Sequence, residues 1–158
     1  MSSPAPSVVA ALQSAGLDYR VLVHTAPVRS LADAAAARGV EVVDVVKTLV
    51  VRRGQDDYLF VLVPGGRQIS WPKLRGLLGI SRMSMPPAAE AFDATGFERG
   101  TITPLGSARA WPVVADVVLA SRGEITLGSG VHDVAIGVDA TALLEAMAAT
   151  IADVTDEE

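Results

Sequence analysis

Short apolar runs, either alternating with polar residues or rich in β-branched residues, recur along the chain and predict β-strands. In residues 19–23, Tyr19, Val21 and Val23 share one face of the expected strand. Residues 45–51 and 58–63 are two β-branched blocks, and the polar residues between them predict a hairpin. Further strands are expected around residues 68–70 and over residues 113–119, 124–127 and 134–138.

Helices are predicted where apolar residues recur at intervals of three or four. Ser7 is expected to cap a first helix that Gly16 ends. Ser30 and Asp33 resemble a capping box before the alanine-rich residues 31–38. The pattern therefore predicts two helices in the first quarter of the chain.

Three further helices are expected after the hairpin. Pro72 suits the first turn of a helix that runs to about residue 78, and a proline pair precedes another helix over residues 88–92. Asp139 or Thr141 is expected to cap a last helix. Its apolar side holds Leu143, Leu144, Met147 and Ile151. The acidic residues 153–158 are expected to fray.

The order of these elements predicts the fold class. Strands outnumber helices, and several strands are joined by turns of hairpin length, which favours α+β with a mixed, largely antiparallel sheet over a doubly wound parallel one. No repeat or linker interrupts the pattern, so residues 1–158 are expected to form one domain.

Composition removes several classes of function. The chain has 158 residues, with 13 Lys+Arg against 18 Asp+Glu and a net charge of −5, which speaks against a broad basic surface for duplex DNA. Aromatic residues make up only 4%, too few for a platform of stacked bases. Because cysteine is absent, disulfide scaffolds, thiol nucleophiles and Cys-ligated zinc are excluded. A metal site built on imidazole would have only His24 and His132.

The hydropathy of the chain bears on its location. No apolar run approaches the roughly 18 residues that a membrane helix needs. The first residues lack the basic and apolar regions of a secretory signal. We therefore expect a soluble cytoplasmic protein with no membrane partner.

Lys47 is one of only two lysines, and it stands in the apolar sequence Val45-Val46-Lys47-Thr48-Leu49. An ammonium that points inward from such a strand is partly desolvated, which lowers its pKa or demands an anionic or dipolar partner. Alternatively, Lys47 lies on the solvent face of the strand and its stem covers apolar surface. Thr48 points to the opposite face in either case.

Residues 96–106 read Gly-Phe-Glu-Arg-Gly-Thr-Ile-Thr-Pro-Leu-Gly and predict an irregular loop. Its backbone groups cannot all pair in a ladder, so the loop is able to present N–H donors to a carbonyl oxygen. A plain surface connection fits the same pattern. The glycine spacing is not that of a dinucleotide-binding fingerprint.

A second glycine-containing turn is expected at Gly128-Ser129-Gly130, followed by Val131, His132 and Asp133. Small residues allow close approach of a ligand, and His132 is a candidate for acid–base chemistry. Adjacent strand residues point to opposite faces, so His132 and Asp133 need not interact. A Ser–His–Asp triad on Ser129 lacks the nucleophile-elbow motif and is rejected.

Three motifs, taken in their order along the chain, resemble the YbaK/prolyl-tRNA-synthetase-associated editing-domain family. They are the Lys47-Thr48 pair, the Gly100-x-x-x-Pro104-x-Gly106 loop and the Gly128-Ser129-Gly130 turn. The resemblance runs from about residue 17 to residue 144. It implies a compact α+β domain with a curled, mixed sheet and flanking helices. It also implies a deacylase that hydrolyses mischarged aminoacyl-tRNA, notably on the proline tRNA, and that takes part in translation fidelity without a cofactor or metal.

The resemblance also assigns roles to residues. It implies that Lys47 is the essential lysine, contacting the 3′-terminal adenosine or the ester, and that the loop at Gly100 orients the aminoacyl group and a water. Both are therefore expected to be catalytic. Expected substrate-binding residues are Thr48, Thr101, Ile102, Thr103, Pro104, Gly106, Ser129, Gly130 and His132. His24 and Tyr19 lie near the pocket edge of the family. An activated ester needs only a positioned water and donors for the oxyanion, so no protein nucleophile is required.

Two departures from the family pattern bear on substrate. Thr48 follows Lys47 as in the YbaK-like branch, whereas the alanine-editing branch tends to have Asn there, and Ala135 stands where some members carry an acidic residue. The amino acid removed, whether Cys, Ala, Ser or a non-protein analogue, stays open. The acidic net charge implies a weak grip on the CCA end of the tRNA. Four arginines are expected to help bind the CCA end: Arg52, Arg53, Arg67 and Arg99. A synthetase such as prolyl-tRNA synthetase is a candidate partner.

Two other classes of function remain as alternatives. A non-catalytic module that retains the editing pocket would bind tRNA or a synthetase and cleave nothing. An enzyme that forms a Schiff base on Lys47 would use a desolvated amine as nucleophile, but the sequence offers no companion phosphate or carboxylate site.

Overall fold

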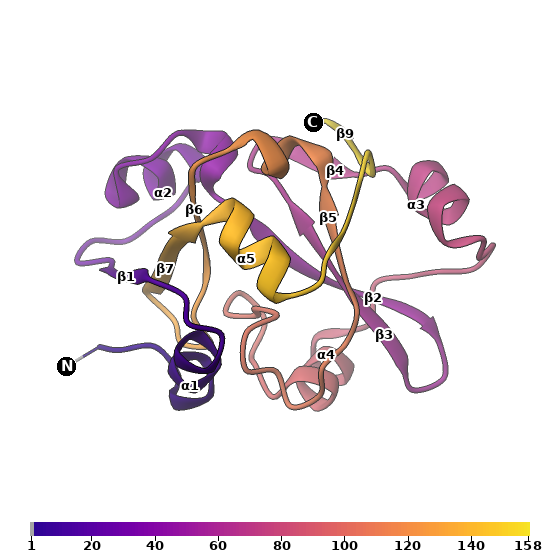
Figure 1. The fold of residues 1–158 in the computed structure, drawn as a ribbon, viewed down its shortest axis with the longest axis horizontal. Coiled ribbons are helices and arrows are strands. Elements are labelled where there is room, and N and C mark those ends of the chain that lie inside the picture. Colours follow the sequence, from indigo (N-terminus) through magenta and orange to yellow (C-terminus); the bar gives the residue numbers. More distant parts are fainter. Residues whose placement is uncertain (1) are drawn as a thin grey trace.

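The computed structural model describes residues 2–158, which form three small β-sheets (Figure 1). One sheet has the order β1 (Tyr19–Val23), β7 (Val134–Asp139) and β6 (Glu124–Gly128). The second has the order β2 (Lys47–Gly54), β3 (Asp57–Val63), β5 (Val113–Asp116) and β8 (Thr150–Ala152). The third pairs β4 (Arg67–Ile69) with β9 (Thr155–Glu157).

Strand pairing in these sheets is mixed. β3 and β5 run parallel, as do β5 and β8, while the other four pairs of strands are antiparallel. An isolated parallel bridge from Val45 to Thr126 connects the first two sheets. The prediction of an α+β domain with mixed, largely antiparallel pairing is therefore confirmed, with the strands divided among three sheets.

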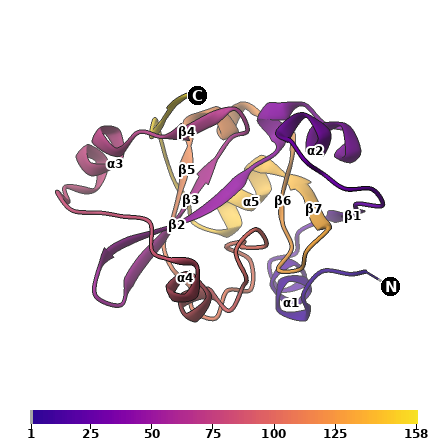
Figure 2. The ribbon, with the colours of Figure 1, turned by 180° about the vertical axis from the view of Figure 1, so that it is seen from behind.

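Within residues 2–158 the sheets are joined by five α-helices, and Figures 1 and 2 show their arrangement from the front and from behind. They are α1 (Pro6–Ser14), α2 (Leu31–Arg38), α3 (Trp71–Leu78), α4 (Ala88–Thr95) and α5 (Ala140–Ala146), with 3₁₀ turns η1 (Val42–Asp44) and η2 (Val117–Ser121). The hydroxyl of Ser30 accepts a hydrogen bond from Asp33 N at the start of α2, as the capping box predicts. None of the helices within residues 2–158 has the length and apolar character needed to span a membrane.

The main core lies between the first two sheets and joins α1, α4 and α5 to them. Phe60 and Leu62 of β3 are its central side chains and are almost fully buried. Burial of each such side chain contributes about 1.5–3 kcal/mol to folding. Leu105, from the loop of residues 96–106, is also fully buried, so the core anchors this loop.

Several predicted boundaries are wrong. Ser7 does not cap α1, because Pro6 already occupies the first turn and the N-cap position falls on Ala5. The segment after Asp116 turns into η2 rather than continuing as a strand, because the Asp116 carboxylate accepts from Val118 N. The last helix ends at Ala146, which leaves Ile151 in β8 and half-exposed instead of on an apolar helix face.

The acidic end is ordered where fraying was expected. Residues 155–157 form β9, which pairs with β4. Inside the fold, the buried hydroxyl of Thr155 donates to the buried carboxylate of Asp116. On the surface, Lys73 forms ion pairs with Asp153 and Asp156. Attractive contacts from distant parts of the chain therefore outweigh the repulsion among the acidic residues.

Candidate functional site

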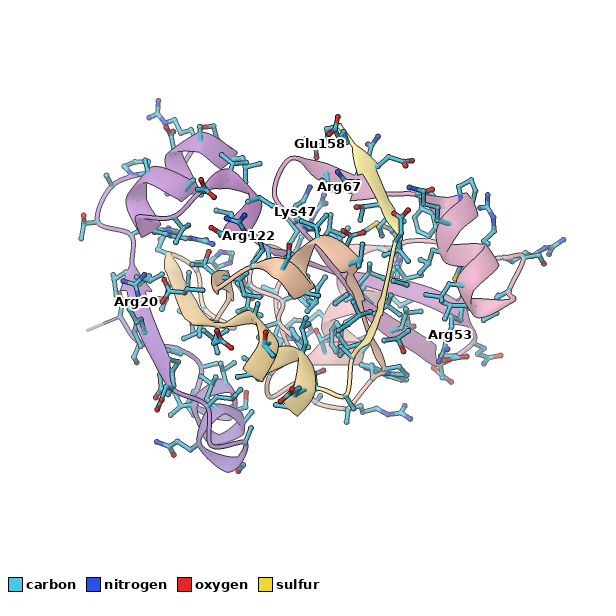
Figure 3. All side chains as sticks on the ribbon, turned by 45° about the horizontal axis from the view of Figure 1, so that its top comes forward. Arg20, Lys47, Arg53, Arg67, Arg122 and Glu158 are labelled. Carbon is cyan, nitrogen blue, oxygen red and sulfur yellow. The ribbon has the colours of Figure 1, made fainter. Side chains whose placement is uncertain are left out.

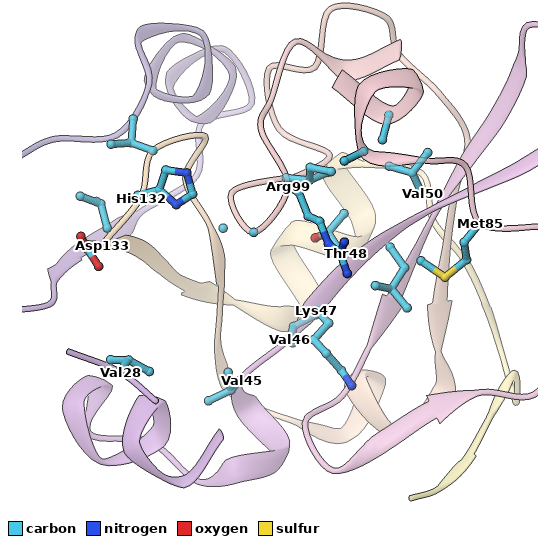
Figure 4. A pocket seen from close by; sticks show the side chains of 18 of the residues that line it. Val28, Val45, Val46, Lys47, Thr48, Val50, Met85, Arg99, His132 and Asp133 are labelled. Carbon is cyan, nitrogen blue, oxygen red and sulfur yellow. The ribbon is translucent and has the colours of Figure 1, made fainter. Parts of the chain in front are cut away.

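One cavity of about 770 Å³ opens between β2, α2, the start of α4, the loop of residues 96–106 and the turn after β6 (Figure 4). This volume lies in the range of about 300–1,000 Å³ typical of small-molecule sites. Its walls are largely aliphatic, and its polar lining comes from His24, Arg38, Lys47, Thr48, Arg99, His132 and Asp133. Lysine and arginine therefore outnumber carboxylates here, although the whole chain carries a net charge of −5.

Lys47 and Gly100 line this same cavity, together with Ile102. Lys47 is the first residue of β2 and pairs with Val63, so the β2–β3 hairpin fixes its backbone. The Lys47 side chain is 38% exposed. Its ammonium therefore lies at the rim of the cavity, neither deeply desolvated nor free in solvent.

The Lys47 ammonium already has two protein partners. Nζ donates to the carbonyl oxygen of Arg67 at 3.0 Å and to Oε1 of Glu158 at 3.1 Å. Arg67 belongs to β4, and Glu158 directly follows β9, so the third sheet presents both acceptors (Figure 3). The dipolar or anionic partner that an ammonium in an apolar strand requires is thus supplied by the chain itself.

Thr48, the next residue of β2, also lines the cavity. Its Oγ1 is buried and has no hydrogen-bond partner within residues 2–158. A buried hydroxyl without a partner costs about 1–3 kcal/mol. An atom of a bound ligand that completed this hydrogen bond would recover that cost.

The loop of residues 96–106 is shaped by hydrogen bonds within and around it. Gly100 has φ +90°, in the left-handed region that favours glycine. Thr101 Oγ1 donates to the carbonyl of Glu98 at 2.7 Å, and Gly130 N donates to the carbonyl of Thr101 at 2.9 Å. Thr103 is fully buried and its hydroxyl accepts from Leu105 N.

The end of this loop is fixed by Gly106. A Cβ at that position would lie 2.3 Å from the carbonyl oxygen of Ser7, so only glycine lets α1 pack against the loop. Of the expected loop residues, Gly100 and Ile102 line the cavity. Thr101, Thr103, Pro104 and Gly106 lie outside the lining and support the loop from behind.

The turn after β6 packs tightly on the loop. A Cβ on Gly128 would lie 2.6 Å from the carbonyl oxygen of Ile102, and one on Gly130 would lie 2.8 Å from the Phe97 ring. Ser129 is buried and donates to the carbonyl of Val134 at 2.7 Å. Ser129 and Gly130 are therefore structural neighbours of the cavity rather than part of its lining.

His132 lines the cavity opposite Lys47. Its Nε2 lies 3.0 Å from Oε2 of Glu98, and both side chains are largely exposed. This contact links the turn to the loop near Gly100. Asp133 also lines the cavity and has φ +63°.

At the far end of the cavity, Arg38 of α2 holds His24. Arg38 Nε donates to His24 Nε2 at 3.2 Å, and Nη1 donates to Thr126 Oγ1 at 2.9 Å. A guanidinium group only donates, so His24 Nε2 is the acceptor and the neutral imidazole carries its proton on Nδ1. Burial lowers the pKa of His24, the charge of Arg38 lowers it further, and Asp133 opposes the shift.

No sequence pattern singles out Arg38, because an arginine in the last turn of a helix is a common partner of the helix dipole. His24 does line the cavity, whereas Tyr19 packs against the main core. Within residues 2–158, no group of three His, Asp or Glu side chains is arranged to hold a metal ion.

Comparison with known proteins places this fold and cavity in a family. The model of the aminoacyl-tRNA editing domain matches residues 25–146. The chain therefore belongs to the aminoacyl-tRNA editing domain family. Residues 25–146 contain Lys47, the loop of residues 96–106 and the turn after β6.

Among curated proteins, the chain is similar to proline–tRNA ligases. It is 36% identical over 97 residues to that of Thermosipho melanesiensis, covering 61% of this chain and 17% of the ligase. It is 29% identical over 119 residues to that of Trichlorobacter lovleyi, covering 75% of this chain and 21% of the ligase. The chain thus spans about a fifth of the length of these relatives.

Among solved structures, one neighbour is described as a proposed trans-editing enzyme for prolyl-tRNA synthetase. It has a TM-score of 0.86 and 27% identity, and the match covers 98% of this chain and 99% of that one. A hypothetical protein also matches with a TM-score of 0.86 and 29% identity, over 95% of this chain and 99% of that one. The likeness extends over almost the whole chain.

Proposed function

We propose that this chain hydrolyses the ester of mischarged aminoacyl-tRNA, with the proline tRNA carrying cysteine, alanine or another small amino acid as substrate. The observation that carries the proposal is that Lys47 and Gly100 open onto one cavity. The membership in an editing-domain family and the similarity to proline–tRNA ligases support the substrate class. Such a substrate places the reaction in the cytoplasm.

In the proposed reaction, a water adds its oxygen to the ester carbonyl carbon. The bond to the ribose oxygen then breaks, and that oxygen leaves with the proton that the water loses, giving free amino acid and uncharged tRNA. The ammonium of Lys47 and the backbone N–H groups of the loop at Gly100 are the donors for the developing oxyanion and the substrate carbonyl. The hydroxyl of Ser129 is already bonded to Val134, which argues against a serine nucleophile.

A positioned water needs a cavity that fixes the ester. The contacts of Gly128 and Gly106 with neighbouring backbone hold the loop and the turn against each other and against α1. Rigid placement of the reacting groups lowers the entropic part of the barrier. The residues expected to bind substrate but lying behind the lining, such as Thr103 and Ser129, act in this proposal by supporting the wall.

One observation favours a second function, that of a non-catalytic module. The Lys47 ammonium is bonded to Glu158, as it would be in a pocket that no longer performs chemistry. In that case the chain would bind tRNA or a synthetase without cleaving the ester.

A screen of tRNAs, each charged with a series of correct and incorrect amino acids, tests the first proposal. We expect release of the amino acid from at least one mischarged tRNA and loss of that release in Lys47→Ala. If no charged tRNA is cleaved while tRNA or synthetase binding is measurable, the module is the correct function.

A further inference from the structure

We propose that Arg99 binds a phosphate group of the nucleic-acid 3′ end at the mouth of the cavity. This inference rests on the proposed function, because it names the part of a tRNA substrate that one residue recognises. Arg99 directly precedes Gly100, so a phosphate held by Arg99 would fix the 3′ end beside the loop that we propose orients the ester.

The cations that line the cavity differ in whether their side chains have partners in the protein. Lys47 donates to Arg67 and Glu158, and Arg38 donates to His24 and Thr126. Arg99 lines the same cavity, and within residues 2–158 no hydrogen bond or ion pair engages its side chain. A guanidinium group offers five N–H donors in a planar fork, which suits an anion with two oxygens.

The other three arginines that were candidates for the CCA end have partners in the protein. Arg52 pairs with Glu90, Arg53 pairs with Asp57, and Arg67 donates to Thr155. None of these three lines the cavity. Of the four candidates, Arg99 is therefore the one whose position and free donors fit a ligand in the cavity.

Arg99 lies near a second group that lacks a partner among the described residues. In Figure 4 the Arg99 side chain extends from the loop toward Thr48 on β2. The buried Oγ1 of Thr48 also lacks a hydrogen-bond partner within residues 2–158. Arg99 and Thr48, supplied by two separate segments, thus line the same cavity, one with free cationic donors and the other with a buried hydroxyl that lacks a partner in the described part of the chain.

Phosphate is the anion that this arrangement fits best. The 3′ end of every tRNA carries phosphodiesters, and their oxygens accept from arginine in bidentate geometry. A charge-assisted contact of this kind would supply affinity that an acidic protein otherwise lacks. The structure thereby reconciles a net charge of −5 with a nucleic-acid substrate.

The test compares a substrate that carries the phosphodiesters of the tRNA 3′ end with one that carries no phosphate. The ester cleaved in the tRNA screen is prepared on a CCA trinucleotide and on adenosine alone, and both are given to wild type, Arg99→Gln and Arg99→Lys. Arg109→Gln is the matched control, since Arg109 stacks over Trp111 at 4.4 Å, outside the cavity, and its loss removes the same charge.

For Arg99→Gln we expect KM for the CCA ester to rise about tenfold with kcat little changed, as the loss of one charge-assisted contact implies. The adenosine ester should be cleaved at the wild-type rate. Arg99→Lys should recover part of the loss, and Arg109→Gln should resemble wild type. Equal effects of Arg99→Gln on both esters, or equal effects of the Arg99→Gln and Arg109→Gln variants, would overturn the proposal.

A binding experiment separates this inference from the proposed hydrolysis. Uncharged CCA and adenosine are titrated into wild type and Arg99→Gln by NMR at several salt concentrations. We expect weaker CCA binding by the variant and a salt slope smaller by about 0.7, the value for one phosphate of a single strand. If no ester is cleaved but the variant binds CCA more weakly than wild type, the phosphate site is confirmed and the proposed hydrolase activity is wrong. If CCA binding is the same in both proteins, the phosphate site is wrong whatever the hydrolysis result.

Discussion

The ammonium of Lys47 is bound to the carboxylate of Glu158 at 3.1 Å, an ion pair between the first residue of β2 and the residue after β9. The pair exists because β9 adds to β4, and Glu158 N donates to the carbonyl of Gly66 at 3.1 Å. An acidic side chain from this end of the chain thus occupies the amine to which we assign a catalytic role. A substrate that binds the Lys47 ammonium uses its third N–H or competes with Glu158 for one that is already engaged.

We predict that Glu158→Gln increases kcat/KM for deacylation by about two- to fivefold. The size follows from the value of a largely exposed ion pair, at most about 1 kcal/mol. Glu157→Gln is the matched control, because it removes the same charge from the neighbouring residue of β9, for which no ion pair with Lys47 is formed. Equal rates for the two variants under low salt would show that the ion pair does not compete with substrate.

Lys47→Ala should lower the deacylation rate at least about 100-fold, the loss typical for a donor to a developing oxyanion. The unfolding free energy should change by less than about 1 kcal/mol, because the removed ammonium lies at the rim and its ion pair is exposed. Steady-state kinetics and urea denaturation measure the two effects. A variant that stays folded and keeps more than a tenth of the activity would remove Lys47 from the mechanism.

Much of the fold follows from local chemistry that the sequence displays. As the capping patterns predict, α2 begins at the hydroxyl of Ser30 and ends at Gly39, which has a left-handed conformation. α3 ends at Gly79 in the same conformation. The β-branched blocks form β2 and β3 with a hairpin between them. In each case the signal lies within a few residues of the element that it defines.

The parts that sequence reasoning missed depend on contacts between distant residues. The order of residues 155–157 requires β4 and the buried Asp116, which lie far away in the chain. The same holds for the site. Lys47 and Gly100 line one cavity, whereas the pairing of Arg38 with His24 depends on how α2 packs, which no local motif encodes.

Thr48→Val should stabilise the protein and weaken substrate binding. Valine has nearly the shape of threonine, and it removes a buried hydroxyl that has no partner within residues 2–158. We expect the unfolding free energy to rise by about 1 kcal/mol and KM to increase. Thermal unfolding with parallel kinetics checks both. A less stable variant would mean that an ordered water already satisfies this hydroxyl in the free protein.

The pKa of His24 predicts how stability depends on pH. Burial and the charge of Arg38 lower this pKa from the ordinary histidine value of 6.5, so the unfolded chain binds a proton more readily than the folded one. The neutral form of His24 therefore contributes fully to the free energy of unfolding above pH 6.5, and this contribution is lost as the pH falls through the lowered pKa.

In an NMR titration we expect His24 to titrate below 6.5 in wild type and closer to that value in Arg38→Gln. A wild-type pKa above 6.5 would contradict the assigned causes. His24→Asn should also lose less stability than wild type when the pH is lowered through this range.

Gly106→Ala should be strongly destabilising, because the new Cβ would lie 2.3 Å from the carbonyl oxygen of Ser7 and the residue has φ +69°. Gly16→Ala is the matched control, since its φ is +66° and nothing lies within 4 Å of the added Cβ. The control isolates the cost of a left-handed alanine, about 1–2 kcal/mol. Urea denaturation should show a clearly larger loss of unfolding free energy for Gly106→Ala than for Gly16→Ala. The deacylation activity of Gly106→Ala should fall as well, because α1 no longer packs against the loop that contains Gly100. Equal losses of unfolding free energy for the two variants would mean that the loop moves to accommodate the new Cβ at no energetic cost. Its contact with α1 would then not shape the cavity.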